Sequence, residues 1–176
     1  DIAHHLGLPG LSREAAAACT DKELMRQKFA LAPEKISPAF KAVSDENELL
    51  EFARNHHLPL ILKPANLSKS LLVTKNSSHE ELLANYQKAI GLIGGVYKKY
   101  APNSQPKLIV EEFLEGPIFS VDAFVDASGE PHVLDNVVDY QTGYDIGFDD
   151  NFHYSRILPS RLSQPDIDAI RHAAAV

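Results

Sequence analysis

The chain has 176 residues, of which 44% are hydrophobic and 23% are charged, an ordinary composition for a globular protein with one domain or two small lobes. A net charge of -7 argues against a general nucleic-acid binder, which needs a basic face, although a few local lysines could still hold a small anion. The single cysteine, Cys19, excludes an internal disulfide and a multi-cysteine zinc site, and no apolar run approaches the ~20 residues that span a bilayer.

Helix starts are predicted along the chain by residues that can cap the first turn. Such a residue accepts a hydrogen bond from a backbone N–H group that the helix itself leaves unpaired. The predicted starts are Thr20 with Glu23, Ser44 before an acidic first turn, Ser78 with Glu81, and Ser163 with Asp166.

Strands are predicted between these helices, where β-branched and apolar residues gather. The runs are FKAV (40–43), LPLILKP (58–64), SLLVTK (70–75), KLIVEEFL (107–114), IFSVDAFVD (118–126) and EPHVLDNVVDY (130–140). The second and third runs are expected to pair as antiparallel strands, and Ser128–Gly129 is expected to turn a hairpin between the last two. This order favours an α+β fold with antiparallel sheets, and the proline-containing segment 98–107 is expected to separate two lobes.

Two lysines and two glutamates are the first candidates for chemistry. Lys63 ends the apolar run LIL and precedes a polar loop, so it either meets an anion or extends its stem to water. Lys22 lies in the first turn of a helix, where a cation is locally unfavourable, and a solvated lysine is the alternative. Glu111 and Glu112 alternate along a strand, so they point to opposite faces and do not form an acid–base pair.

Taken in order, four segments resemble the ATP-grasp superfamily, which includes biotin carboxylase, carbamoyl phosphate synthetase and carboxylate–amine ligases. They are GLPGLSREAAAACTDKELMRQKFA, LILKP, ANLSKSLLV, and LIVEEFLEG followed by SVDAFVD. The resemblance covers nearly the whole chain. It implies a two-lobed α+β fold with antiparallel sheets flanked by helices. Residues 1–30 would be the leading helices, 31–105 the first lobe with the phosphate loop, and 106–176 an incomplete second lobe.

The resemblance also implies roles for particular residues in binding ATP. Lysines would carry charge to the phosphates, a loop would close over them, and a strand end would offer backbone groups and apolar surface to the adenine. The implied binding residues are Lys22, Lys63, Ser68, Lys69, Ser70, Glu111, Glu112, Phe113, Leu114 and Asp122.

The chain departs from the family pattern in three respects. Segment 65–70 contains no glycine, although the family's phosphate loop is usually glycine-rich. Ile118 stands where the family often has an acid that reaches the ribose. The chain starts at Asp1 and stops at Val176, and the resemblance implies that an N-terminal lobe and a metal-binding segment lie outside it. Mg²⁺ is therefore expected in the full-length parent, and the isolated chain is expected not to turn over ATP.

These features lead to two hypotheses of different kinds. In the first, the chain is the ATP-binding part of a cytoplasmic ligase that activates a small carboxylate as an acyl phosphate for attack by an amine. In the second, it is a non-catalytic ATP-grasp-like interaction or regulatory domain with weak or no nucleotide binding. A biotin-dependent carboxylase subunit is a third possibility. The expected partners are ATP, the carboxylate and the remainder of the parent chain, with a homodimer possible and with no nucleic acid or membrane.

An acidic segment, YDIGFDDNFH (144–153), has two interpretations. Asp145, Asp149, Asp150 and His153 carry groups that could bind a divalent ion. The simpler interpretation, which the sequence favours, is a solvated loop after a hairpin.

Overall fold

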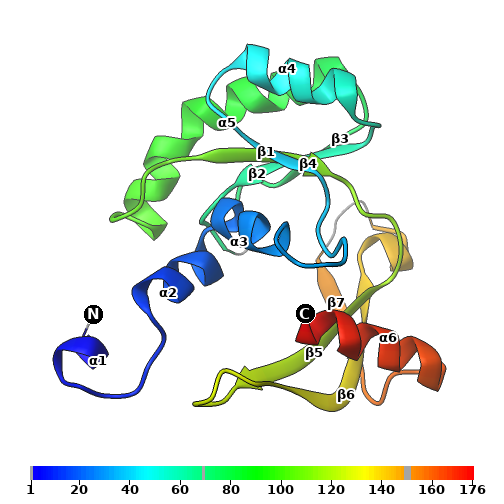
Figure 1. Ribbon diagram of the computed structural model, residues 1–176. Coiled ribbons are helices and arrows are strands. Elements are labelled where there is room, and N and C mark those ends of the chain that lie inside the picture. The colour runs from blue at the N-terminus through cyan, green and yellow to red at the C-terminus, as the bar shows by residue number, and fades with distance from the viewer. Residues whose placement is uncertain (1, 69, 149–151) are drawn as a thin grey trace. The chain divides into compact units, whose positions relative to one another are not determined.

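The chain folds into two compact units, Asp1–Leu114 and Glu115–Val176. The computed structural model describes residues 2–68, 70–148 and 152–176 (Figure 1). Each unit contains one antiparallel sheet with helices, which confirms the α+β class expected from the sequence. Within the described ranges, no helix combines the length and the apolar character that crossing a membrane requires.

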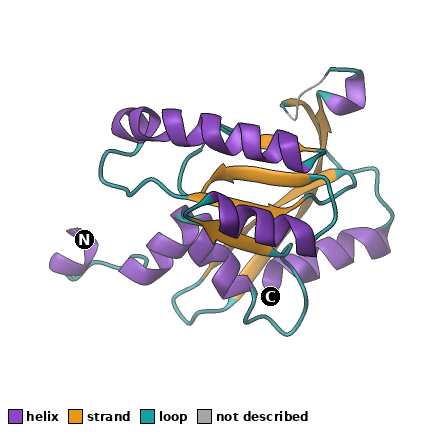
Figure 2. Cartoon of the chain, turned by 90° about the horizontal axis from the view of Figure 1, so that it is seen from above, coloured by secondary structure: helices purple, strands orange, loops and turns teal. Residues whose placement is uncertain are grey.

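The first unit is built on a four-stranded antiparallel sheet with strand order β1-β4-β2-β3. Its helices α4 and α5 lie side by side over one face of this sheet, and α3 lies at the other face (Figures 1 and 2). The elements of this unit are α1 (Ile2–His5), α2 (Arg13–Thr20), α3 (Lys22–Phe29), β1 (Phe40–Val43), α4 (Glu46–Asn55), β2 (Leu60–Pro64), β3 (Thr74–Asn76), α5 (His79–Tyr100) and β4 (Leu108–Glu112).

The core of the first unit fills the space between the sheet and helices α4 and α5. Leu60 and Leu62 of β2 and Leu49 of α4 are completely buried in it. Burial alternates along β2, so Ile61 and Lys63 point to the opposite face, the one on which α3 lies. The periodicity of one strand therefore separates the core from the face that carries the candidate lysine.

Helix caps agree with the sequence prediction at Ser78 and differ at the start of α3. The Ser78 hydroxyl accepts from the Glu81 N–H at 3.1 Å, which confirms that cap. Thr20 does not cap α3, because it is the last residue of α2 and its hydroxyl donates back to that helix. Asp21 is the cap instead, and its carboxylate accepts from the Glu23 N–H at 2.9 Å.

The start of α4 shows the same shift of one residue. Asp45 caps the helix and accepts from the Glu48 N–H at 2.9 Å, whereas Ser44 hydrogen-bonds the Glu48 side chain. A carboxylate also complements the positive end of the helix dipole, which favours Asp over the neighbouring hydroxyl residue.

The second unit contains a three-stranded antiparallel sheet, β5-β6-β7, and one α-helix. Its elements are β5 (Ile118–Val125), β6 (Pro131–Thr142), the 3-10 helix η1 (Tyr144–Ile146), β7 (His153–Ile157) and α6 (Gln164–Ala175). The predicted hairpin is confirmed, with Gly129 in the left-handed region at φ 91°. Strand β7 was not predicted, because its residues HYSRI are mostly polar and lack the pattern of a buried strand.

The division between the units falls after Leu114, nine residues beyond the expected start of the second lobe at 106. The physical reason is strand pairing. Strand β4 lies between β1 and β2, with Glu111 opposite both Phe40 and Ile61, so it is an inner strand of the first sheet. The prolines that suggested an earlier break lie in the loop between α5 and β4.

Candidate functional site

Lys63 lies on the α3 side of the first sheet with its charge paired. Its side chain is 14% exposed, and its ammonium contacts the Glu111 carboxylate. Lys63 is opposite Ile109 in the register, so Glu111 is its diagonal neighbour on the same face of the sheet. Lys63 therefore leaves a buried strand, as the sequence suggested, and its ammonium meets a carboxylate of the neighbouring strand β4.

Arg26 of α3 is a third member of this charged group. Its Nη2 lies 3.2 Å and its Nε 3.3 Å from Glu111 Oε2. Sequence reasoning missed Arg26, although it follows Lys22 by one helical turn and therefore lies on the same side of α3. One buried carboxylate consequently serves two cations.

Lys22 brings a further cation to the same region. Its ammonium donates to the carbonyls of Leu67 at 2.7 Å and Ala65 at 3.4 Å, on the loop that follows β2. Burial lowers the pKa of Lys22, and the charge of nearby Lys63 lowers this pKa further. The two predicted lysines therefore interact electrostatically although they are far apart in sequence.

A cavity of about 350 Å³ lies between the two lysines. Its lining residues are Lys22, Lys63, Pro64, Leu67, Ser68, Ser70, Leu71 and Val73. The structure thus brings together Lys22, Lys63, Ser68 and Ser70 from the sequence prediction, while Lys69 lies outside the described residues. Arg26 and Lys63 share the Glu111 carboxylate, whereas the Lys22 ammonium bonds backbone carbonyls. The two ammonium groups that line the cavity suit an anionic ligand.

The loop between β2 and β3 adopts a glycine-like backbone without glycine. Ser70 and Leu72 have φ values of 53° and 56°, in the left-handed region that disfavours residues with a Cβ atom. The Val73 N–H donates to the Ser70 carbonyl at 3.3 Å and closes this turn. The expected strand at 70–75 is therefore shortened to Thr74–Asn76, because a left-handed backbone cannot continue an extended strand.

Replacing Ser70 with glycine is expected to stabilise the first unit. Ser70 is exposed, so the change relieves backbone strain of about 1 kcal/mol without loss of packing. Ser68→Gly is the matched control, because Ser68 does not have a positive φ and glycine there only adds unfolded-state entropy. Urea unfolding should show the higher free energy of unfolding for Ser70→Gly. A lower value than for Ser68→Gly would contradict the strain at Ser70.

Residues 111–114 divide between two directions, as their alternation predicted. Glu111 joins the cations, while the Glu112 carboxylate accepts from the Ala39 N–H at 3.0 Å. The Lys75 ammonium lies 4.1 Å from the centroid of the Phe113 ring, and Leu114 is 66% exposed. The end of β4 therefore presents the Phe113 ring and an exposed leucine next to the charged group.

Asp122 belongs to the second unit. It lies on β5 at an irregularity in the pairing with β6, between Val121 and Ala123, and its side chain is exposed. Its proposed contact with the nucleotide remains a prediction.

One residue of the acidic segment 144–153, Asp145, makes structural hydrogen bonds. The Asp145 carboxylate accepts from the Thr142 N–H at 2.6 Å and from the Thr142 hydroxyl at 2.8 Å, and these bonds lower the pKa of Asp145. Asp149 and Asp150 lie outside the described residues. No group of three His, Cys, Asp or Glu side chains that could hold a metal ion occurs in the part of the chain that the structure describes.

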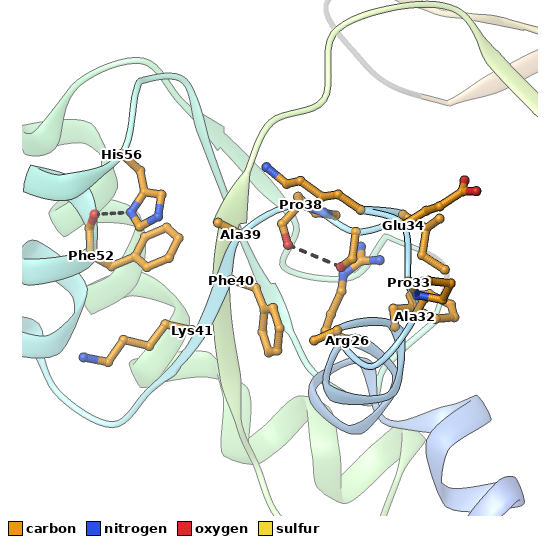
Figure 3. Close-up of a pocket in the computed structure, with 15 residues that line it drawn as sticks. Arg26, Ala32, Pro33, Glu34, Pro38, Ala39, Phe40, Lys41, Phe52 and His56 are labelled. Atoms are coloured by element: carbon orange, nitrogen blue, oxygen red, sulfur yellow. Dashed lines mark hydrogen bonds between the residues drawn. The ribbon is translucent and has the colours of Figure 1, made fainter. Parts of the chain in front are cut away.

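A wider hollow of about 590 Å³ lies around β1 in the first unit (Figure 3). Phe52, His56 and Lys41 line it on one side of the strand, and Arg26 lines it on the other side. Of the three cations Lys22, Arg26 and Lys63, Arg26 alone lines this hollow. Four of the residues predicted from the sequence, Lys22, Lys63, Ser68 and Ser70, line the smaller cavity instead.

The two antiparallel sheets with their helices have the fold of solved ATP-grasp-like structures and define the chain as an α+β protein of that class. The ATP-grasp domain family matches residues 56–173, which is more than half of the chain. The chain therefore belongs to the ATP-grasp family.

Curated relatives and solved structures agree with this assignment. The chain is 30% identical over 128 residues to phosphoribosylamine–glycine ligase of Methanothermobacter thermautotrophicus, covering 72% of this chain and 28% of that protein. It is 27% identical over 175 residues to D-alanine–D-alanine ligase of Pseudomonas putida, covering 96% and 50%. The biotin carboxylase domain of Hydrogenobacter thermophilus 2-oxoglutarate carboxylase has the same fold, with a TM-score of 0.74 at 17% identity, covering 99% of this chain and 37% of that chain. This chain spans between 28% and 50% of the length of these proteins.

Proposed function

We propose that this chain is the ATP-binding part of an ATP-dependent ligase that activates a carboxylate as an acyl phosphate. The observation that carries the proposal is the cavity beside the β2–β3 loop, which two lysines from distant parts of the chain, Lys22 and Lys63, line together. Arg26 shares the Glu111 carboxylate with Lys63. Lys22 and Lys63 would bind phosphate oxygens, and Arg26 would add to the field. The remaining proposed contacts are the loop residues Ser68, Lys69 and Ser70, the adenine segment Glu111, Glu112, Phe113 and Leu114, and Asp122 in the second unit.

The proposed reaction has two steps. A carboxylate oxygen of the substrate attacks the γ-phosphorus of ATP, and the bond to ADP breaks. An amine nitrogen then attacks the acyl carbon, and inorganic phosphate leaves with the electron pair of the C–O bond. The lysines would hold the phosphates and balance their charge, which is the main protein contribution in phosphoryl transfer.

The remaining parts of the proposal concern the whole protein. The biotin carboxylase domain named above was solved with MgADP. By analogy with that domain, we propose that Mg²⁺ accompanies the nucleotide in the parent protein. A small carboxylate and an amine would be the other ligands. We also place the parent in the cytoplasm and keep a homodimer as its proposed assembly.

A second candidate function is a non-catalytic ATP-grasp module. The glycine-free loop and Ile118 favour it, and so does the ion pair between Lys63 and Glu111, because a nucleotide phosphate must compete with that carboxylate. This candidate predicts weak or no nucleotide binding.

Calorimetric titration with ATP and an assay for phosphate release distinguish the two candidates. The isolated chain is expected to bind ATP without turnover, since charge and adenine contacts do not require the metal. The double variant Lys22→Ala and Lys63→Ala should not bind detectably. No binding by the wild type would favour the non-catalytic module, and Mg²⁺-dependent turnover by the wild type would show that the metal site is misplaced.

A further inference from the structure

The start of the β2–β3 loop is tied to the N-terminus of α3. The Lys22 N–H donates to the Ala65 carbonyl at 2.8 Å, and the Lys22 ammonium donates to the Leu67 carbonyl. Ala65 is completely buried and Leu67 is 8% exposed. The position of Lys22 and the path of residues 65–67 therefore depend on one another.

A buried tyrosine near the end of α5 holds the next residue of this loop. Tyr97 is 2% exposed, and its hydroxyl donates to the side-chain carbonyl of Asn66. The same hydroxyl lies 3.3 Å from the Lys107 carbonyl, which also accepts from the Ala65 N–H at 2.9 Å. Burial raises the pKa of Tyr97, so the hydroxyl keeps the proton that it donates.

Lys107 extends this network to the cap of α3. Its ammonium lies 3.1 Å from Asp21 Oδ2 and also contacts the Glu23 carboxylate. Asp21 and Glu23 flank Lys22 in the chain, so Lys107 pairs with the two carboxylates closest in sequence to this cation and offsets part of their negative charge. An unpaired carboxylate there would repel a phosphate.

We propose that Tyr97 and Lys107 are positioning residues that fix the base of the phosphate loop and the Lys22 ammonium for binding a polyphosphate. This inference rests on the proposed function and adds two residues that do not line the cavity between Lys22 and Lys63. The physical reason is the missing glycine. Without glycine, the loop has fewer backbone conformations with which to adapt to a phosphate. A loop that is already held in its binding conformation loses less entropy when the ligand binds.

Tyr97→Phe tests the inference, because it removes one hydroxyl and keeps the ring in the core. The matched control is Tyr86→Phe, which removes the hydroxyl of another buried tyrosine about three turns earlier on the same helix. Hydrogen exchange of residues 65–68 is measured without ligand, and affinities for inorganic tripolyphosphate, adenosine and ATP are measured by calorimetry.

Tyr97→Phe should speed exchange at residues 65–68 and weaken tripolyphosphate binding by about three- to tenfold, the value of one hydrogen bond, while adenosine affinity stays unchanged. Tyr86→Phe should change neither exchange nor affinity. Lys107→Met should weaken tripolyphosphate binding similarly, and Lys107→Arg should preserve it. Wild-type exchange in Tyr97→Phe, or equal losses for tripolyphosphate and adenosine, would overturn the inference. A wild type that does not bind tripolyphosphate would overturn the proposed function, and the exchange data would still decide whether Tyr97 anchors the loop.

Discussion

Lys63→Ala is expected to weaken ATP binding by about ten- to a hundredfold, which corresponds to the loss of one hydrogen bond between charged groups. Lys63 is held by β2 and lines a cavity together with Lys22, so its ammonium has a fixed place beside the expected phosphates. Removal of the Lys63 ammonium also leaves Glu111 with Arg26 as its ion-pair partner among the described residues. The less neutralised Glu111 carboxylate then repels the phosphates, which adds to the loss of affinity.

Lys41→Ala is the matched control for this measurement. Lys41 is also a strand lysine paired with a glutamate, but its ammonium lies 3.0 Å from Glu51 on the α4 side of the sheet. The pair is well exposed, so its removal should change ATP affinity and stability little. Calorimetry with ATP should therefore separate the two variants. Equal affinities for wild type and Lys63→Ala would show that phosphate does not bind at Lys63.

Glu111→Gln is expected to destabilise the ligand-free protein by about 2–4 kcal/mol, somewhat below the usual cost of breaking a buried ion pair. The Glu111 side chain is 7% exposed, and it pairs with Lys63 and Arg26, whose side chains are 14% and 18% exposed. Glutamine can still accept a hydrogen bond, but it leaves two neighbouring cations without a counter-charge. Both cations are partly exposed to water, which screens their charge, so the expected loss in free energy of unfolding is smaller than for a fully buried pair.

A polyphosphate should reverse this loss of stability in part. With Glu111 neutral, an anion bound at Lys63 and Arg26 supplies the missing negative charge, so tripolyphosphate should raise the melting temperature of Glu111→Gln more than that of the wild type. Glu51→Gln is the control, because Glu51 is 67% exposed and its stability should stay within about 0.5 kcal/mol of the wild type. An equal thermal shift in wild type and Glu111→Gln would contradict an anion site beside Glu111.

A comparison of the wild type with Glu111→Gln also separates the two candidate functions. In a ligase, Glu111 orients Lys63 and gives way to phosphate, so binding persists in the wild type. In a non-catalytic module, Glu111 occupies Lys63 permanently, and only Glu111→Gln should bind an anion. ATP affinity should therefore be measured for both proteins. Binding by the wild type favours the ligase, and binding by Glu111→Gln alone favours the non-catalytic module.

Local chemistry let the sequence predict several parts of the fold. Ser78 with Glu81 marked the start of α5, and Ser128–Gly129 marked the hairpin. Each of these features depends on residues within a few positions of one another. Periodicity and capping act over that range, so one segment contains all the information that they require.

Only the tertiary structure decided which charges meet. Glu111 reaches Lys63 across 48 positions and Arg26 across 85, and Tyr97 reaches Asn66 across 31. The membership of β4 in the first sheet was decided in the same way, by its pairing with β1 and β2. A sequence pattern shows which side of a strand faces outward, but the neighbour that fills that side depends on how distant strands and helices pack. For this reason the sequence could offer Lys22 and Lys63 only as candidates, whereas the contacts of Arg26, Tyr97 and Lys107 could be found only from the folded chain.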